Sequence, residues 1–122
     1  MQKTPLAAAS FYKRGYSFNP TYGELPKDIQ AEIQVICVTL TEKIHGVFAM
    51  GFYEDGRVYF EACGNENDYD FDEIGAGLEI ERLTKEKKEL VRALSLWYAM
   101  YRTPEGKAAR DQLFRDRQEG LS

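Results

Sequence analysis

At 122 residues, with 43% hydrophobic and 13% aromatic residues, the chain is long enough to form one domain with a core of its own. Its 20 acidic and 16 basic residues give a net charge of −4, so nothing draws the molecule as a whole to nucleic acid or anionic lipid, and we expect neither partner. The first nine residues carry one lysine and too short an apolar stretch for a signal peptide, and no run approaches the roughly 18 apolar residues of a membrane span, so we expect a cytoplasmic protein.

Residues 1–25 are predicted to form an aromatic N-terminal arm. Five aromatic side chains occur there without a sustained helical or alternating period: Phe11, Tyr12, Tyr16, Phe18 and Tyr22. Because aromatic residues are scarce in disordered segments, we expect the arm to be ordered and to pack against another surface.

The first helix is predicted over residues 26–45. Apolar residues recur there at intervals of three and four, with polar residues between them. Pro26 suits the first turn, where its missing N–H costs nothing, and Asp28 complements the positive end of the helix dipole. His45 and Gly46 close the helix, and we expect Gly46 to take the left-handed conformation that ends many helices.

A β-hairpin is predicted next, with strands at residues 47–53 and 58–63. The pair Asp55-Gly56 favours a two-residue type I′ turn, which places Tyr53 opposite Val58. In this register one face carries Phe48, Met50, Phe52, Tyr59 and Cys63 beside Glu54, Arg57 and Glu61, and the other carries Val47, Ala49, Gly51, Tyr53, Val58, Phe60 and Ala62. Both faces are largely apolar, so we expect helices to cover one and the aromatic arm or a second copy of the chain to cover the other.

A second helical pattern runs over residues 72–102 and stops before Pro104. A continuous helix of that length would measure about 45 Å, which exceeds the size of a compact domain of this length. We therefore expect the helix to break around Gly75–Gly77 or Thr84, or to project from the domain. Its second half, residues 90–101, has hardly any polar face, which predicts burial on all sides.

These elements together predict an α+β fold: a helix, a two-stranded antiparallel hairpin with its turn at Asp55-Gly56, and a long second helix. The predicted organisation is an arm at 1–25, an α-β-β-α core domain at 26–103 and a charged tail at 104–122. We expect the tail to be a frayed or weakly docked helix, because its large apolar residues are few: Leu113, Phe114 and Leu121.

An acidic run at residues 68–73 invites comparison with a calcium site. Asp68, Asp70, Asp72 and Glu79 fall at positions 1, 3, 5 and 12 of a calcium loop. Position 6 is Glu73, where the loop needs a glycine, and the run follows a strand instead of a helix, so we assign no metal. We expect Asp70 to cap the second helix instead, with Glu73 completing a capping box. Gly75-Ala76-Gly77 lacks the remaining residues of a nucleotide-binding loop and is assigned to helix packing or a helix irregularity.

No catalytic set emerges from the remaining residues. His45 is the sole histidine, and its position at a helix end explains it without catalysis. Cys37 and Cys63 belong to apolar segments and lack C-x-x-C spacing, so we interpret both as reduced core residues. The sequence thus predicts no catalytic residue, no cofactor and no metal, and an enzyme is the least favoured class.

One combination of residues resembles a family of small uncharacterised bacterial proteins that is known as a domain of unknown function. It comprises Tyr16-x-x-Asn19-Pro20-x-Tyr22-x-x-Leu25-Pro26, Gln30-x-Glu32-Ile33-Gln34, Cys37-Val38, Thr41-Glu42, the Asp-Gly hairpin and Tyr69-x-x-Asp72-Glu73-Ile74-Gly75. The resemblance covers roughly residues 11–102 and implies a shared fold and a bacterial cytoplasmic setting. It implies no catalytic residue and no ligand.

Two functions fit these patterns. The first is a non-enzymatic oligomeric module, a homodimer or a protein that binds another protein. The reason is that the apolar surfaces of the hairpin and of the second helix need further protein to bury them. Its candidate interface residues are Phe48, Met50, Phe52, Tyr59, Trp97, Tyr98 and Tyr101. The alternative is a small-ligand or sensor domain, with an apolar pocket between the arm, the hairpin and the second helix, edged by Tyr59, Glu61 or Arg57.

Overall fold

The computed structural model describes residues 2–65 and 67–121, and it has a mixed α+β fold. Its elements are β1 (Lys3–Ser10), β2 (Gly15–Phe18), the 3-10 turn η1 (Pro20–Tyr22), α1 (Lys27–Ile44), β3 (Val47–Tyr53), β4 (Val58–Cys63), α2 (Glu73–Glu86), α3 (Lys88–Tyr101) and α4 (Pro104–Leu121). The strands form one antiparallel sheet in the order β2-β1-β3-β4. The α+β class is confirmed, but the described residues form a sheet of four strands where two were predicted, and separate helices where one long helix was predicted.

The aromatic arm extends the sheet instead of covering one of its faces. β1 lies beside β3, with Ala7 opposite Met50 and Ala9 opposite Phe48, and β2 forms the edge beyond β1. The arm therefore contains two strands where the sequence showed no alternation. Its pairing with β3 satisfies the hydrogen-bonding groups that an isolated two-stranded hairpin would leave unpaired.

The turn between β3 and β4 is one residue longer than predicted. The Tyr53 amide donates to the Arg57 carbonyl at 2.8 Å, and Gly56, with φ of 89°, takes the left-handed position of a type I turn that ends in a bulge. Phe52 therefore lies opposite Val58, where Tyr53 was expected. A shift of one residue exchanges the faces of a strand, so the large apolar side chains gather on one side of the hairpin: Phe48, Met50, Phe52, Val58, Phe60 and Ala62.

Helix α1 forms where the sequence predicts it, but it ends differently. His45, not Gly46, takes the left-handed conformation, with φ of 53°, and its amide donates to the Thr41 carbonyl at 2.8 Å. Gly46 is required for another reason. A Cβ atom at this position would lie 2.6 Å from the Phe71 ring and 2.7 Å from the Cys63 carbonyl oxygen.

The second helical segment breaks between α2 and α3, at a position that the sequence did not indicate. Lys87 leaves the helical conformation, with φ of −109° and ψ of 28°, while Gly75–Gly77 and Thr84 lie within α2. Two helices that are joined at an angle can follow the sheet, which a straight helix of that length could not do.

Asp72, and not Asp70, caps α2. The Asp72 carboxylate accepts a hydrogen bond from the Gly75 amide at 2.9 Å. Replacing Asp72 by alanine should lower the free energy of unfolding by about 1 kcal/mol, because it leaves a helix amide without its partner. Asp70→Ala is the matched control and should change stability by less than about 0.5 kcal/mol. Urea unfolding of both variants would refute the assignment if Asp70→Ala were the more damaging of the two.

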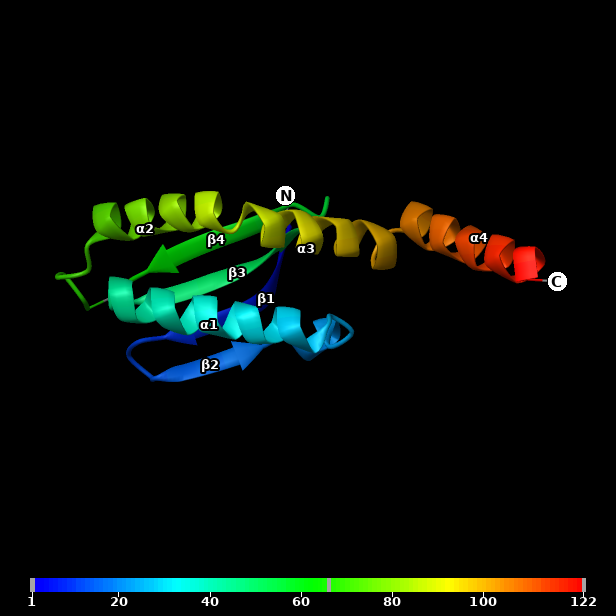
Figure 1. The fold of residues 1–122 in the computed structure, drawn as a ribbon. Helices are drawn as coiled ribbons and strands as arrows, with labels where there is room; N and C mark the ends of the chain where they lie inside the picture. The colour runs from blue at the N-terminus through cyan, green and yellow to red at the C-terminus, as the bar shows by residue number, and fades with distance from the viewer. Residues whose placement is uncertain (1, 66, 122) are drawn as a thin grey trace.

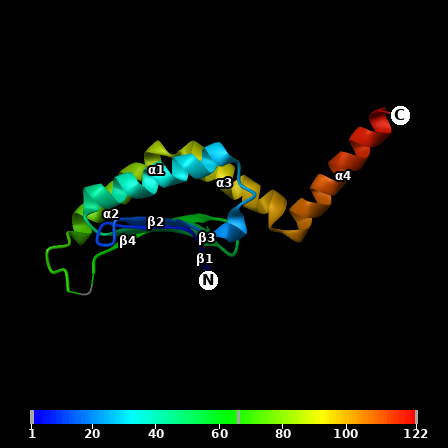
Figure 2. The same cartoon turned by 90° about the horizontal axis from the view of Figure 1, so that it is seen from below.

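All three helices α1, α2 and α3 lie on the same side of the sheet, as Figure 2 shows. The core fills the space between them and the sheet, and its largest fully buried side chains are Phe48, Phe52, Leu6, Ile33, Met50, Leu94 and Cys37. Helix α4 packs against α3 and projects beyond the end of the sheet (Figure 1). None of the helices in residues 2–65 and 67–121 has the length and apolar character needed to cross a membrane.

Candidate interaction surface

Helix α3 is buried on one side only. Leu90 and Leu94 lie in the core, and Trp97 and Tyr98 are half-buried against it. Leu96, on the outer side, is 61% exposed. The expectation that this segment is buried on all sides is therefore wrong, and α3 keeps an apolar surface that faces away from the domain.

A row of stacked side chains connects the core to α4. The Trp97 ring contacts Tyr22 of η1 at 6.0 Å between centroids and stacks on Tyr101 at 5.5 Å. The Arg102 guanidinium lies over both Tyr22 and Trp97, at 5.1 and 5.2 Å. Arg110 of α4 lies over the Tyr101 ring at 4.3 Å, so a cation–π contact joins the two helices.

The corner between α3 and α4 is fixed by local contacts. The Thr103 hydroxyl accepts from the Gly106 amide at 3.1 Å, which caps α4, and donates to the Ala99 carbonyl. Pro104 then begins the helix, a position where proline is favoured. A Cβ atom at Gly106 would overlap the Ala99 carbonyl, so the close approach of the two helices depends on glycine.

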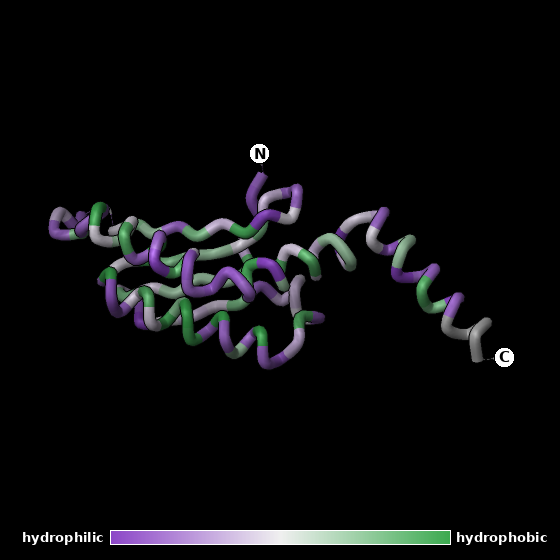
Figure 3. The backbone as a smooth tube through the Cα atoms, turned by 45° about the horizontal axis from the view of Figure 1, so that its top comes forward, coloured by the Kyte–Doolittle hydropathy of each residue, from purple (hydrophilic) through white to green (hydrophobic). Residues whose placement is uncertain are grey.

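Five apolar side chains form what we call the corner surface: Leu96, Met100, Tyr101, Leu113 and Phe114. Leu113 and Phe114 are 62% and 59% exposed. A shallow cavity of about 220 Å³ lies between the last turn of α3 and α4, lined by four of these side chains and Arg110. Figure 3 shows hydrophobic and hydrophilic segments alternating along α4. The corner surface and the adjoining Arg110 thus combine apolar, aromatic and arginine side chains, and aromatic, methionine and arginine side chains are enriched in protein–protein interfaces.

The predicted interface residues lie in three different settings. Phe48, Met50 and Phe52 are 0% exposed and covered by the chain's own helices, so the reason for expecting a second subunit over them is removed. Tyr59 is buried too, but on the opposite face of the sheet, over Gly51. The remaining three, Trp97, Tyr98 and Tyr101, belong to α3, where Trp97 stacks on Tyr101 and Tyr98 contacts Phe52.

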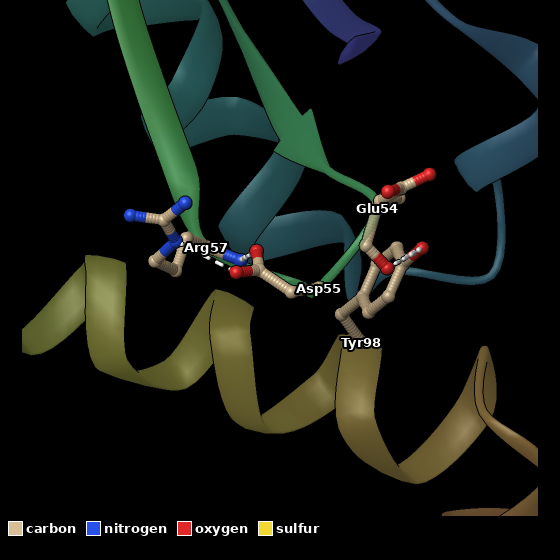
Figure 4. A network of polar contacts seen from close by, with 4 residues as sticks. All are labelled: Glu54, Asp55, Arg57 and Tyr98. Carbon is tan, nitrogen blue, oxygen red and sulfur yellow. Dashed lines mark hydrogen bonds and ion pairs between the residues drawn. The ribbon is translucent and has the colours of Figure 1, made fainter. Parts of the chain in front are cut away.

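Tyr98 docks the β3–β4 turn onto α3, as Figure 4 shows. Its hydroxyl donates to the Glu54 carbonyl at 3.3 Å, and a Cβ atom at Gly56 would lie 2.8 Å from its ring. The Asp55 carboxylate accepts from the Arg57 amide at 3.1 Å and pairs with the Arg57 guanidinium at 2.8 Å, which holds the pKa of Asp55 below its usual value. Tyr98 is therefore occupied within the chain.

Within residues 2–65 and 67–121, no helix lies over the outer face of the sheet (Figure 2). Across β1 and β4, Lys3 pairs with Glu61 at 3.2 Å and lies over the Tyr59 ring at 5.2 Å. The arm does not provide the cover predicted for this face. Small side chains such as Ala8 and Ala49 occupy the adjoining positions on this face.

The titratable residues singled out in the sequence are engaged in structural contacts. His45 stacks on Phe11 at 4.7 Å. Cys37 lies in the core as predicted, and burial raises the pKa of its thiol to about 12. Cys63 is exposed, so its assignment to the core is wrong. The Tyr12 hydroxyl donates to Asp68 at 2.6 Å, and within the described part of the chain no group of three or more His, Cys, Asp or Glu side chains could hold a metal ion.

Larger cavities lie elsewhere, and two of them bear on ligand binding. One, of about 720 Å³, is lined by the end of β4, the following segment and the first half of α2, and we call it the β4–α2 cleft: Ala62, Cys63, Gly64, Asn65, Asp68, Tyr69, Phe71, Glu73, Ala76, Gly77 and Ile80. The other, of about 320 Å³, lies between the β1–β2 turn and α1 and contains Tyr16. Burial raises the pKa of Tyr16 to about 12. Neither cavity is lined by Tyr59, Glu61 or Arg57, so the predicted edge of a ligand pocket is not part of either.

Comparison with known families shows which family the chain belongs to. The model of a family of unknown function (DUF6145) matches residues 3–106. The chain belongs to this family. No curated protein and no solved structure matches the chain.

The family match begins earlier in the chain than the predicted resemblance did, since it includes β1. The family match ends at residue 106, two residues after Pro104. It therefore contains α3 and the start of α4 but neither Leu113 nor Phe114. The sequence shows both residues as large apolar side chains of the tail, but nothing in it connects them with Tyr101. The signal available was Thr103-Pro104 followed by Gly106, which is typical of a new helix with a capped beginning.

Proposed function

We propose that this protein is an interaction module that associates with further copies of itself through the corner surface. The observation that carries the proposal is that α4 packs mainly against α3 and still exposes Leu113 and Phe114. Isolated helices are marginal in water, and most helical stability in proteins comes from packing of an apolar face. Helix α4 would gain that packing from a second chain.

The size of the gain supports the proposal. Burying an exposed leucine or phenylalanine side chain contributes about 1.5 to 3 kcal/mol, and the corner surface offers several such groups. Arg110 and Tyr101 are of the residue types that dominate binding energy in protein interfaces. The charges on α4 do not oppose association, because acidic and basic residues are balanced between Glu105 and Asp116.

Self-association is tested by measuring molar mass at different protein concentrations. We expect light scattering or sedimentation of the full chain, between about 1 and about 100 µM, to give a mass that rises above the 14.0 kDa of one chain. Phe114→Ser should shift this rise to at least about tenfold higher concentration. Ala108→Ser, on another face of the same helix, is the control and should leave it unchanged. A mass of one chain at every concentration would refute the proposal.

Binding of a small ligand remains the second candidate function. It is favoured by the size of the β4–α2 cleft, because a volume of about 720 Å³ lies within the range of about 300 to 1,000 Å³ that ligand sites occupy. A thermal-shift screen of charged and aromatic metabolites tests it. Stabilisation that Gly77→Leu abolishes would support a ligand in this cleft, whereas the absence of any stabilising compound would count against it.

A further inference from the structure

The β4–α2 cleft has the chemistry of a site for a basic and apolar partner. Both charged side chains that line it, Asp68 and Glu73, are acidic. Phe71, Ala76 and Ile80 supply an apolar wall. The cleft is open at Gly77, because a Cβ atom placed there would have no atom within 4 Å.

Helix α4 carries the complementary chemistry. Arg110 lies three residues before Leu113 and four before Phe114, so these three side chains share one face of the helix. The exposed leucine and phenylalanine provide the apolar part and the guanidinium the positive charge. Because a guanidinium can stack on an aromatic ring and still donate hydrogen bonds from its edge, Arg110 remains able to pair with a carboxylate while it lies over Tyr101.

These two complementary parts lie at opposite ends of the molecule. The segment that joins β4 to α2 lies at one end of the sheet, and α4 projects from the other end in both Figure 1 and Figure 2. Helix α4 therefore cannot enter the cleft of its own chain. A second copy of the chain brings a matching cleft within reach.

A symmetric pair of α4 helices fits the charges less well. Such a pair would place the same face of both helices together. That face carries Arg110 and, three residues after Leu113, Asp116, so it offers Arg110 no uniformly acidic surface. The cleft instead offers Asp68 and Glu73 to Arg110. Opposite charges across an interface favour one partner and one orientation over others.

We infer that α4 of one copy binds in the β4–α2 cleft of another copy, with Leu113 and Phe114 against Phe71 and Ile80 and with Arg110 facing the acidic side chains. This inference rests on the proposed self-association and names the surface that receives the corner surface. Reciprocal exchange of helices would give a closed dimer, and exchange in one direction would give a ring or an open chain.

The test uses two full-length variants, each of which damages one half of the contact. Phe114→Ser removes the apolar side chain from α4, and Gly77→Leu fills the cleft. Gly77→Leu should fold normally, since the added side chain meets no neighbour at its Cβ atom and leucine favours a helix more than glycine does. Gly77→Ala, a smaller change at the same position, is the control and should assemble as the wild type does.

We expect each variant alone to require at least about tenfold more protein than the wild type to assemble. An equimolar mixture should form a pair of twice 14.0 kDa at concentrations where neither variant does so alone, because one variant supplies an intact helix and the other an intact cleft. If Gly77→Leu alone assembles like the wild type, the cleft is not the receiving surface, although self-association stands. If both variants fail alone and the mixture also stays monomeric, the pairing of helix and cleft is overturned. A wild-type chain that is monomeric throughout would overturn this inference together with the proposed function.

Discussion

Replacing Gly51 by alanine is expected to destabilise the domain by about 3 kcal/mol, the upper range for overpacking a well-packed site. Gly51 lies in β3 between Pro5 of β1 and Tyr59 of β4. A Cβ atom at this position would overlap the Thr4 carbonyl and lie 2.7 Å from the Tyr59 hydroxyl oxygen. The tyrosine side chain can move, but the carbonyl belongs to the backbone of the neighbouring strand, so relief requires the β1–β3 pairing to distort.

Gly77→Ala is the matched control for this prediction. Gly77 lies in α2 with open space where its Cβ atom would be, so alanine should raise the free energy of unfolding by about 0.5 to 1 kcal/mol. Urea unfolding of both variants provides the comparison. Equal small effects would mean that β1 does not hold Thr4 against Gly51, and the observed β1–β3 register would then be in error.

Much of the helical structure could be predicted from local signals, and the strand register could not. The spacing of apolar residues from Ile29 to Ile44 identifies α1 because the helical period is repeated over several turns. Asp55-Gly56 correctly locates a hairpin but is compatible with more than one turn type. A glycine with positive φ serves the two-residue turn and the longer turn with a bulge equally well, and the two differ by one residue in register.

Strand β1 was not predicted because the residues that define it as a strand, those of its partner β3, lie elsewhere in the chain. Ala7, Ala8 and Ala9 favour no strand by themselves, and the register irregularity between Pro5 and Ala7 interrupts any alternation. The strand is defined by its pairing with β3, about forty residues further along the sequence. A pairing between strands so far apart in the sequence leaves no signature in the residues of β1 alone.

The candidate surface could be predicted only in part, for a similar reason. The sequence predicts Tyr101 in an interface and shows Leu113 and Phe114 as large apolar residues. Their meeting depends on the break at Lys87 and on the corner at Gly106, which together set the direction of α4. Neither feature follows from hydropathy, because the break is a local change of backbone conformation at a lysine.

Replacing Phe48 by alanine should separate stability within one chain from stability gained by association. Phe48 is fully buried in β3 beside Phe60, at 6.0 Å between ring centroids, and its cover comes from the same chain. We expect a loss of about 3 to 5 kcal/mol, the range for a buried phenylalanine, and the same loss at every protein concentration. Urea unfolding at about 2 and about 50 µM, concentrations that span the expected range of association, provides the measurement.

Phe114→Ala makes the same chemical change at a ring that is 59% exposed. At the lower concentration it should alter the free energy of unfolding by less than about 0.5 kcal/mol, because the monomer leaves more than half of that side chain exposed. At the higher concentration it should remove the extra stability that the wild type gains by association, since binding to the folded state stabilises it by mass action. A different result would contradict this assignment: a loss caused by Phe48→Ala that grew with concentration, beside a constant loss caused by Phe114→Ala. Phe48 would then contribute to association, and Phe114 only to the stability of one chain. The interface would then have to be sought at the hairpin, which supplies four of the seven interface residues predicted from the sequence.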